Sequence, residues 1–439
     1  MPTTIDGTIS ASATPKTRVL FGHPAGLTIL FLTEMWADFS YYGMRALLVY
    51  YMTRRLGLAI ATASTIYGLY TAAAHLTPLA GGVLADRWLG KRTSVASGAT
   101  IMALGHFMMA SPALFFPALA TIAIGFGLFI PSLPSQVASL YTAGDPRLDR
   151  AYSVYYVGIN LGSFLAPLVC GTLGEKYGWK VGFGAAGIGM LAGLVIYLVG
   201  MPLLPPVTSR LTHDGRPAEF GARLRPIFRP LCLIALAVIL FRIAYEQIGN
   251  SVALWTEAGV NRDIQLFSHF VVPMTWFQSL NPLFIFLLTP IILRSWKHQA
   301  TCNRESSAVA KMAFGAMLLG SAFLIIAAAS ASAGAGEERT SWVVLVLFML
   351  VLTAGELFFM PIGLSLVTRF APIEHRATLL GGWFILAFVA NLAAGLLGRN
   401  FGDWSPGVFF SVCGGIALTA AILLRTVRRV NLLSADGAS

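Results

Sequence analysis

Four polar residues recur at helical spacing inside an apolar stretch near the N-terminus. The stretch reads TEMWADFSYYGMR from residue 33, and its polar positions are Glu34, Asp38, Tyr41 and Arg45. At about 100° per residue, these side chains fall within one narrow arc of a helix. A charge at the centre of a membrane helix costs roughly 2.5–3.5 kcal/mol, so such a stripe usually faces a bundle interior or a water-filled path. The stretch therefore predicts a helix that lines a route for a solute or a proton.

The composition indicates an integral membrane protein. Of the 439 residues, 56% are hydrophobic and only 11% are charged, with a mean hydropathy of +0.73. Apolar stretches long enough to cross a bilayer predict twelve helices, an all-α membrane protein. They lie at 27–52, 65–85, 94–111, 113–141, 151–173, 178–202, 229–256, 268–293, 308–333, 341–369, 377–399 and 406–424.

The predicted helices form two sets of six. We expect an N-terminal six-helix bundle over 1–202, a cytoplasmic linker over 203–228 and a C-terminal six-helix bundle over 229–439. The linker is polar and too short to hold another pair of spans. We therefore expect no extra helix pair between the halves.

The distribution of Lys and Arg predicts the orientation. With a cytoplasmic N-terminus, 21 of the 30 Lys and Arg residues lie on that side, and 7 lie on the opposite side. This bias follows the positive-inside rule and predicts a multi-pass inner-membrane protein with both termini cytoplasmic. The net charge of +11 then faces an anionic leaflet, so it does not indicate a nucleic-acid partner. No apolar signal-peptide core precedes the first span.

Motifs for enzymatic chemistry are missing from the sequence. It has no HExxH, GxSxG or P-loop lysine motif, and its four cysteines lack metal-ligand spacing. We expect no enzyme activity, no metal, no cofactor and no disulfide; an intramembrane hydrolase that uses Asp38 is a remote alternative. Two six-helix halves around a polar midplane instead indicate a secondary transporter of the major facilitator kind.

A glycine-rich, charged segment joins the second and third predicted spans. GGVLADRWLGKR, residues 81–92, combines small residues at two helix ends with charges for the cytoplasmic face. It resembles the loop motif of major facilitator transporters, in the version typical of the proton-dependent oligopeptide transporter (POT/PTR) family. The positions that carry this motif are Gly82, Asp86, Arg87, Gly90, Lys91 and Arg92.

Further segments in both halves are similar to motifs of the same family, in the same order. They are VYYVGINLGSFLAP (154–167), AYEQIGNSVALW (244–255), FQSLNPLFIFLLTP (277–290), GELFFMPIGLSLVTRFAP (355–372) and GGWFILAFVANLAAG (381–395). The chain is accordingly identified as a divergent member of the POT family. This resemblance implies the major facilitator fold and alternating access driven by a proton gradient.

The first and fourth helices depart from the family pattern. The family's first helix usually reads ExxER before FSYYGMR, whereas residues 34–38 here read EMWAD, with Ala37 for the second Glu and Asp38 for the Arg. In the fourth helix, Ile130 stands where the family usually has a lysine before a proline. Loss of one member of a buried charge cluster would leave an uncompensated charge. The joint loss therefore indicates re-specialisation, with a decayed transporter as the alternative.

Two new polar residues accompany these losses. Arg242 replaces a tryptophan common in the family and lies one helical turn before Glu246, and His75 replaces a usual cavity tyrosine. Arg242 either only neutralises Glu246 or anchors a substrate carboxylate. His75 either substitutes for the tyrosine as a hydrogen-bonding group or titrates near neutral pH beside Asp38.

The positions implied by the resemblance, together with the new residues Asp38, His75 and Arg242, give two groups of predicted site residues. The predicted substrate-binding residues are Tyr41, Tyr42, His75, Asn160, Arg242, Asn281 and Trp383. The predicted proton-coupling and gate residues are Glu34, Asp38, Arg45, Glu246 and Glu356. Arg45 and Glu246 are expected to pair as an outer gate. Glu356 lacks the family's lysine partner, so we expect it to be protonated more of the time and to provide a second proton site.

Three functions remain in competition at this point. The first is proton-coupled import of peptides or a peptide-like solute by a monomer in the bilayer, without any cofactor beyond the proton gradient. The second is transport of a non-peptide substrate such as a siderophore, an antibiotic or a modified amino acid. The third is a non-transporting sensor, which is disfavoured because no soluble signalling domain is evident in the sequence.

Overall fold

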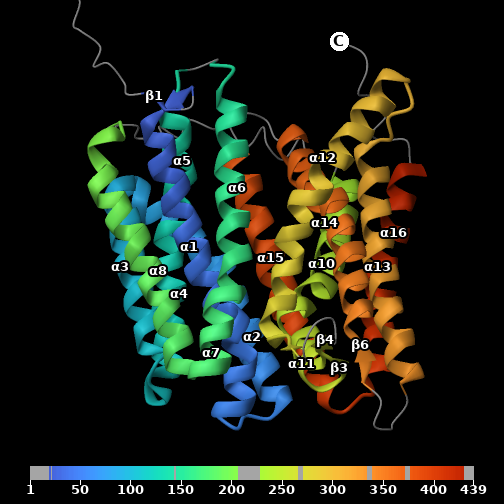
Figure 1. Ribbon diagram of the computed structural model, residues 1–439. Helices are drawn as coiled ribbons and strands as arrows, with labels where there is room; N and C mark the ends of the chain where they lie inside the picture. The colour runs from blue at the N-terminus through green and yellow to red at the C-terminus, as the bar shows by residue number, and fades with distance from the viewer. Residues whose placement is uncertain are drawn as a thin grey trace, which may run out of the picture.

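The computed structural model describes residues 19–20, 22–142, 145–205, 228–264, 270–333, 339–370 and 376–429. Most of the predicted linker, residues 203–228, lies outside the described residues, as does the chain before residue 19 and after residue 429. The described chain is almost entirely helical, and its helices stand side by side in two groups (Figure 1).

The first group contains the six N-terminal spans. Its elements are α1 (Ala25–Tyr50) with the π-turn η1 (Tyr51–Arg55), α2 (Ile60–Leu84) with η2 (Ala85–Leu89), α3 (Lys91–Met108), η3 (Pro112–Leu114), α4 (Phe115–Phe129), α5 (Ser132–Ser139), α6 (Leu148–Ala166), η4 (Pro167–Gly171), α7 (Thr172–Tyr177), α8 (Trp179–Gly200) and η5 (Met201–Leu203). Several spans therefore consist of two or three consecutive helical pieces.

The second group contains the six C-terminal spans. Its elements are α10 (Phe228–Tyr245), η6 (Glu246–Gly249), α11 (Ser251–Ala258), η7 (Met274–Ser279), α12 (Leu280–Thr301), α13 (Ala308–Ser332), α14 (Trp342–Phe370), α15 (Arg376–Gly398), η9 (Arg399–Gly402) and α16 (Pro406–Arg429). Each of the twelve predicted spans thus has a helical counterpart in the described chain.

Short strand pairs occur only at the ends of helices in the described chain. β1 (Val19–Leu20) pairs with β2 (His23–Pro24) antiparallel, and β4 (Asp263–Ile264) pairs with β5 (Phe270–Val271) in the same way. β3 (Val260–Asn261) pairs with β6 (Thr340–Ser341) in parallel. They join helix ends and add no sheet to the core.

Nine helical stretches of the described chain are long and apolar enough to cross a membrane by length and composition. They run from Pro112–Ser139 in the first group to Pro406–Val427 in the second. The helices α1, α2 and α3 are not among these nine, and α1 carries the three charges of the opening stretch. At a rise of about 1.5 Å per residue, even the 18 residues of α3 approach the thickness of a hydrocarbon core.

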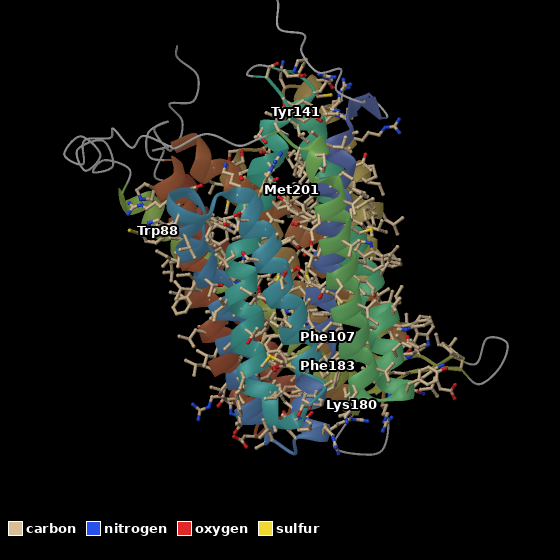
Figure 2. All side chains as sticks on the ribbon, turned by 90° about the vertical axis from the view of Figure 1, so that its left-hand side faces the viewer. Trp88, Phe107, Tyr141, Lys180, Phe183 and Met201 are labelled. Atoms are coloured by element: carbon tan, nitrogen blue, oxygen red, sulfur yellow. The ribbon has the colours of Figure 1, made fainter. Side chains whose placement is uncertain are left out.

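The helices of the first group approach one another closely at small residues. A Cβ atom built on Gly81 of α2 would lie 2.0 Å from the carbonyl oxygen of Gly127 on α4. On the far side of this bundle, Phe107 of α3 packs over Gly187 of α8, and both Phe107 and Phe183 lie toward the Lys180 end in Figure 2. Such glycines allow two helix backbones to come within contact distance, which also stabilises helix pairs in membranes.

The segment with the loop motif turns sharply from α2 into α3. Gly90 has a φ of 74°, a conformation that residues with a side chain rarely adopt, and α3 begins at the next residue, Lys91. The guanidinium of Arg92 donates a hydrogen bond to the carbonyl oxygen of Leu204, which follows α8. The motif therefore ties the α2–α3 turn to the end of the sixth span, and Trp88 points outward beside it (Figure 2).

We predict that Gly81→Ala destabilises the protein, because the new methyl group would contact the backbone of α4, which cannot rotate away. Overpacking of this kind costs about 1–3 kcal/mol. The matched control is Gly184→Ala on α8, where a Cβ atom would meet nothing within 4 Å. Thermal unfolding in detergent should show a lower Tm for Gly81→Ala and no loss for Gly184→Ala. Equal Tm values for the two variants would contradict the close approach of α2 and α4.

Candidate functional site

A cavity of about 710 Å³ lies between the two helix groups. It collects side chains from α1, α2, α6, α10, α12, α14 and α15. The predicted site residues that line it are Asp38, Tyr41, Tyr42, Arg45, His75, Asn160, Arg242, Glu246, Asn281, Glu356 and Trp383. The structure therefore brings together residues that are up to 345 positions apart in the sequence.

An ionic cluster stands where α1 meets η6. Arg45 Nη2 lies 2.6 Å from Glu246 Oε2, and Arg242 Nη2 lies 3.2 Å from Glu246 Oε1. Arg45 Nε also donates a hydrogen bond of 2.7 Å to the hydroxyl of Tyr67 on α2. Glu246 is only 4% exposed, so its carboxylate is desolvated and bound by two guanidinium groups, one from each bundle. The predicted pairing of Arg45 and Glu246 is present in this conformation.

His75 extends the cluster along α2. Its Nδ1 lies 2.8 Å from the carbonyl oxygen of Thr71, and its Nε2 lies 3.1 Å from Arg242 Nη2. The charged group in contact with the imidazole is therefore Arg242. Of the two alternatives drawn from the sequence, a hydrogen-bonding group agrees with these contacts, whereas the titrating alternative placed Asp38 beside the ring.

The carboxyl groups of Glu34 and Asp38 form a separate acidic pair on α1. Both side chains are buried, and Glu34 Oε2 and Asp38 Oδ2 have no hydrogen-bond partner among the described residues. Of this pair, only Asp38 lines the cavity; of the predicted stripe, Asp38, Tyr41 and Arg45 face the cavity and Glu34 does not. Two close buried carboxyl groups without a cation are stable only if at least one is protonated.

The C-terminal bundle contributes a second acidic position. Asn281 on α12 donates a hydrogen bond of 2.7 Å to Glu356 Oε2 on α14, and it lies 3.1 Å from Thr353 Oγ1. The Trp383 ring lies against Gly363 of α14, where an added Cβ atom would meet it at 3.0 Å. Glu356 thus faces the cavity with a neutral amide as its partner.

Several cavity and cluster residues escaped the sequence prediction. They are Tyr67, Phe126, Tyr156, Tyr245, Gln278 and Trp296. For Tyr156 a signal was available, since it precedes Asn160 by four residues within the VYYVGINL segment and so shares its helix face. Tyr67 could not be found in this way, because its contact with Arg45 joins two helices whose relative rotation the sequence does not reveal.

The hydrogen bonds that join the two bundles in the described chain lie toward one side. Among the described residues, the hydrogen bonds between them run from the level of the cavity toward the end that holds η1, α7 and α11, opposite the described chain ends (Figure 1). Gly68 of α2 and Gly395 of α15 also touch backbone to backbone there. At the other end the cavity is lined by Leu293, near the end of α12, and Leu364, near the end of α14. The cavity therefore extends toward the side of the chain ends.

A second group of contacts between the bundles involves Glu175 on α7. Its carboxylate accepts hydrogen bonds from the backbone N–H groups of Met274 and Thr275, each 3.1 Å, and from the Thr275 hydroxyl at 2.9 Å. These N–H groups begin η7, so an acidic side chain of one bundle caps a helical turn of the other. The Thr275 side chain also fills the space beside Gly171, where a Cβ atom would lie 2.0 Å from Oγ1.

The comparison with protein families decides the assignment. The family model described as "POT family" matches residues 92–210 and 218–403, which is more than half of the sequence. The chain belongs to the POT family. It is therefore a multi-pass membrane transporter with the major facilitator fold, and not an enzyme.

Named relatives of this POT family member cover nearly its whole length. It is 32% identical to the peptide transporter YePEPT of Yersinia enterocolitica, over 94% of this chain and 96% of the relative. It is 30% identical to a di-/tripeptide transporter of Lactococcus lactis, with the same coverage. The first alignment spans 496 positions, more than the 439 residues here, so that relative has segments without a counterpart in this POT transporter.

Solved structures support the fold. A crystal structure of peptide transporter POT in complex with sulfate is 30% identical, with a TM-score of 0.82, covering 94% of this chain and 96% of that one. A mutant of peptide transporter POT in complex with alafosfalin is 31% identical, with the same TM-score and coverage. A POT family transporter in complex with 5-aminolevulinic acid is 24% identical, covers 95% of this chain and 98% of that one, and has a TM-score of 0.83, which supports the fold alone.

We predict that Glu175→Ala loosens η7 in this POT transporter. A hydrogen bond to a charged group contributes roughly 1.5–3 kcal/mol, so its loss should speed amide exchange in Met274–Ser279 by about tenfold or more. Hydrogen–deuterium exchange followed by mass spectrometry measures this directly. The control is Lys180→Gln, a nearby exposed charge on α8; it should leave exchange in Met274–Ser279 at the wild-type rate. Unchanged exchange in Glu175→Ala would mean that the cap does not hold the bundles together.

Proposed function

We propose that this POT family member imports peptides or peptide-like small solutes together with protons. It works as a monomer in the inner membrane, with both termini cytoplasmic, as the excess of Lys and Arg on that side indicates. Its two bundles rock about the central cavity and expose it to one side of the membrane at a time. In this orientation, the conformation described above is open to the cytoplasm and closed to the outside.

The observation that carries the proposal is the position of Glu246. Its carboxylate lies at the cavity and joins Arg45 of one bundle to Arg242 of the other. Protonation of Glu246 would remove the charge that holds Arg45, which would release α1 from η6 on the outer side. A proton taken up from outside is thereby coupled to opening of the outer gate.

The cavity has charges that suit a zwitterionic solute. Arg242 is 11% exposed, lines the cavity, and its Nε has no hydrogen-bond partner among the described residues. A substrate carboxylate near this guanidinium would form charge-assisted bonds in a desolvated site. Asp38 and Glu356 face the same cavity and provide acidic positions for an amino group. The named peptide transporters among the relatives support this class of solute.

The second candidate is a non-peptide substrate such as a siderophore, an antibiotic or a modified amino acid. The observation that favours it is the charge reversal at Asp38 together with the apolar Ile130. These positions place no cation where the family usually has an arginine and a lysine. A solute whose cationic group lies beside Asp38 would fit this part of the cavity.

Uptake by the purified protein in liposomes tests the proposed function. A panel of di- and tripeptides is compared with non-peptide solutes, with and without an acidic outside solution, and an internal dye reports proton entry. We expect at least one peptide to accumulate against its gradient only when the proton gradient is present. Accumulation of non-peptide solutes alone would replace the proposal by the second candidate, and transport that ignores the proton gradient would remove proton coupling.

We predict that Arg242→Gln weakens binding of anionic and zwitterionic substrates by about tenfold or more, which corresponds to the lower end of a charge-assisted hydrogen bond. Arg242→Lys should keep part of the affinity, because it retains the charge but loses the planar, bidentate geometry. Equilibrium binding in detergent is the appropriate measurement, since it removes the proton gradient from the readout.

The double variant Arg242→Gln with Glu246→Gln separates the two roles considered for Arg242. If Arg242 only neutralises Glu246, the double variant should bind substrate as well as the wild type does. If Arg242 contacts the substrate carboxylate, the double variant should bind as weakly as Arg242→Gln. Normal binding by the double variant would remove Arg242 from the substrate site.

A further inference from the structure

The contacts of His75 fix the protonation of its ring in this conformation. A backbone carbonyl only accepts hydrogen bonds, so the 2.8 Å contact with Thr71 requires a proton on Nδ1. A guanidinium only donates, so the 3.1 Å contact with Arg242 requires an unprotonated Nε2. Both contacts are satisfied together only by the neutral imidazole with its proton on Nδ1.

This neutral imidazole forms a direct link between the bundles. Thr71 and His75 belong to α2 of the first bundle, whereas Arg242 belongs to α10 of the second. The same Nη2 atom of Arg242 donates to His75 Nε2 and to Glu246 Oε1. His75 thus keeps one end of the Arg242 guanidinium at the cavity wall, beside Glu246 and away from the open space.

A proton on Nε2 would convert this attraction into repulsion. The imidazolium would present an N–H group to a guanidinium N–H group at hydrogen-bond distance, and two cations would stand together in a desolvated site. Arg242 would have to leave His75, which breaks the link between α2 and α10 and frees the guanidinium for a carboxylate. A substrate carboxylate placed between the two cations would in turn stabilise the protonated imidazole.

The surroundings of His75 supply one anion and two cations. Glu246 favours the imidazolium, whereas Arg242 and Arg45 disfavour it. Asp38 of α1 lines the same cavity, and the described side chains of α4 and α15, which also pack against α2, include no titratable group. The charged residues on the elements that meet α2 at its ends are Arg54, Arg55, Asp86, Arg87 and Arg399.

We propose that His75 is a proton-dependent positioning residue, which holds Arg242 at the cavity wall when neutral and releases it to the substrate carboxylate when protonated. The proton comes from the outside solution, resides on Nε2, and leaves to the cytoplasm after the substrate has gone. Binding of the proton and binding of the carboxylate then strengthen each other reciprocally. The inference deepens the proposed function and rests on it for the identity of the substrate.

The first arm of the test needs no substrate. Nitrogen-15 NMR of histidine-labelled protein in nanodiscs distinguishes the two neutral tautomers and the imidazolium, and His75→Gln identifies the signal of His75. We expect the Nδ1-protonated neutral form at about pH 8 and a growing share of the imidazolium as the pH is lowered to about 5. A ring that keeps one form throughout this range, or that carries its proton on Nε2 when neutral, would overturn the proposal.

The second arm measures uptake of the peptide that the wild type accumulates, at an outside pH of about 6 and of about 8, within the range of histidine titration. His75→Gln should lower the ratio of the two uptake rates by about fivefold or more and raise the KM at the acidic pH, since one buried hydrogen bond to a charged group is worth at least that factor. The control is His106→Gln, which removes a fully buried histidine of α3 that does not line the cavity. Its ratio should equal that of the wild type.

A wild-type ratio in His75→Gln would overturn the role of His75, even if its NMR signal titrates. If His75→Gln does not fold, His75→Tyr, which restores the residue usual in the family, replaces it in both arms. If the wild type accumulates no peptide at either pH, the proposed function is wrong. The NMR measurement alone then tests whether His75 changes its protonation. The two failures are therefore distinguishable.

Discussion

The shared carboxylate of Glu246 is the interaction on which the contact between the two bundles depends, on the side that the proposed function assigns to the outside. Two partly buried arginines from facing bundles bind its two oxygens and compensate a buried charge that would otherwise be costly. Removal of one partner from such an arrangement costs about 3–5 kcal/mol. The same carboxylate thus holds the two bundles together and responds to a proton, because protonation removes its charge and leaves its side chain in place.

A second ion pair, between Arg54 of η1 and Glu257 of α11, also joins the bundles, at the end farther from the described chain ends. Other contacts between the bundles are neutral. The Glu175 cap, the Gly68–Gly395 approach and the Ser64–Asn250 hydrogen bond contain no pair of opposite charges, and they hold the ends of helices in register. They close the outer side when the bundles meet, but none of them lies in the cavity where a substrate would bind. Alternation requires the charged cluster and these neutral contacts to separate together. The cluster at the cavity is the part that a proton and a substrate reach directly.

Much of the architecture was predictable from the sequence, because each membrane span is a continuous run of apolar residues. The twelve spans, the paired Arg45 and Glu246 and the cavity positions followed from apolar runs and family motifs. The sequence did not reveal how each helix is rotated about its own axis. Glu34 lies in the same arc of α1 as Asp38 but does not line the cavity. The rotation of α2 and α10 also brings His75 into contact with Arg242. The Glu175 cap joins residues about a hundred positions apart and has no local signature. Such contacts depend on how two bundles pack, which a single sequence does not encode in any readable pattern.

The distance between the outer ends of the two bundles tests the central claim most directly. The distance is measured by pulsed electron paramagnetic resonance in nanodiscs. One spin label is attached at Lys180→Cys, at the start of α8, and the other at Asp403→Cys, directly after η9. The two exposed native cysteines, Cys232 and Cys302, are replaced by serine. The account predicts a short distance for the wild type at neutral pH and a larger population of longer distances for Glu246→Gln at the same pH, because the amide cannot hold both arginines. A distance distribution in Glu246→Gln that equals the wild type would contradict the claim that the charge of Glu246 keeps the outer side closed.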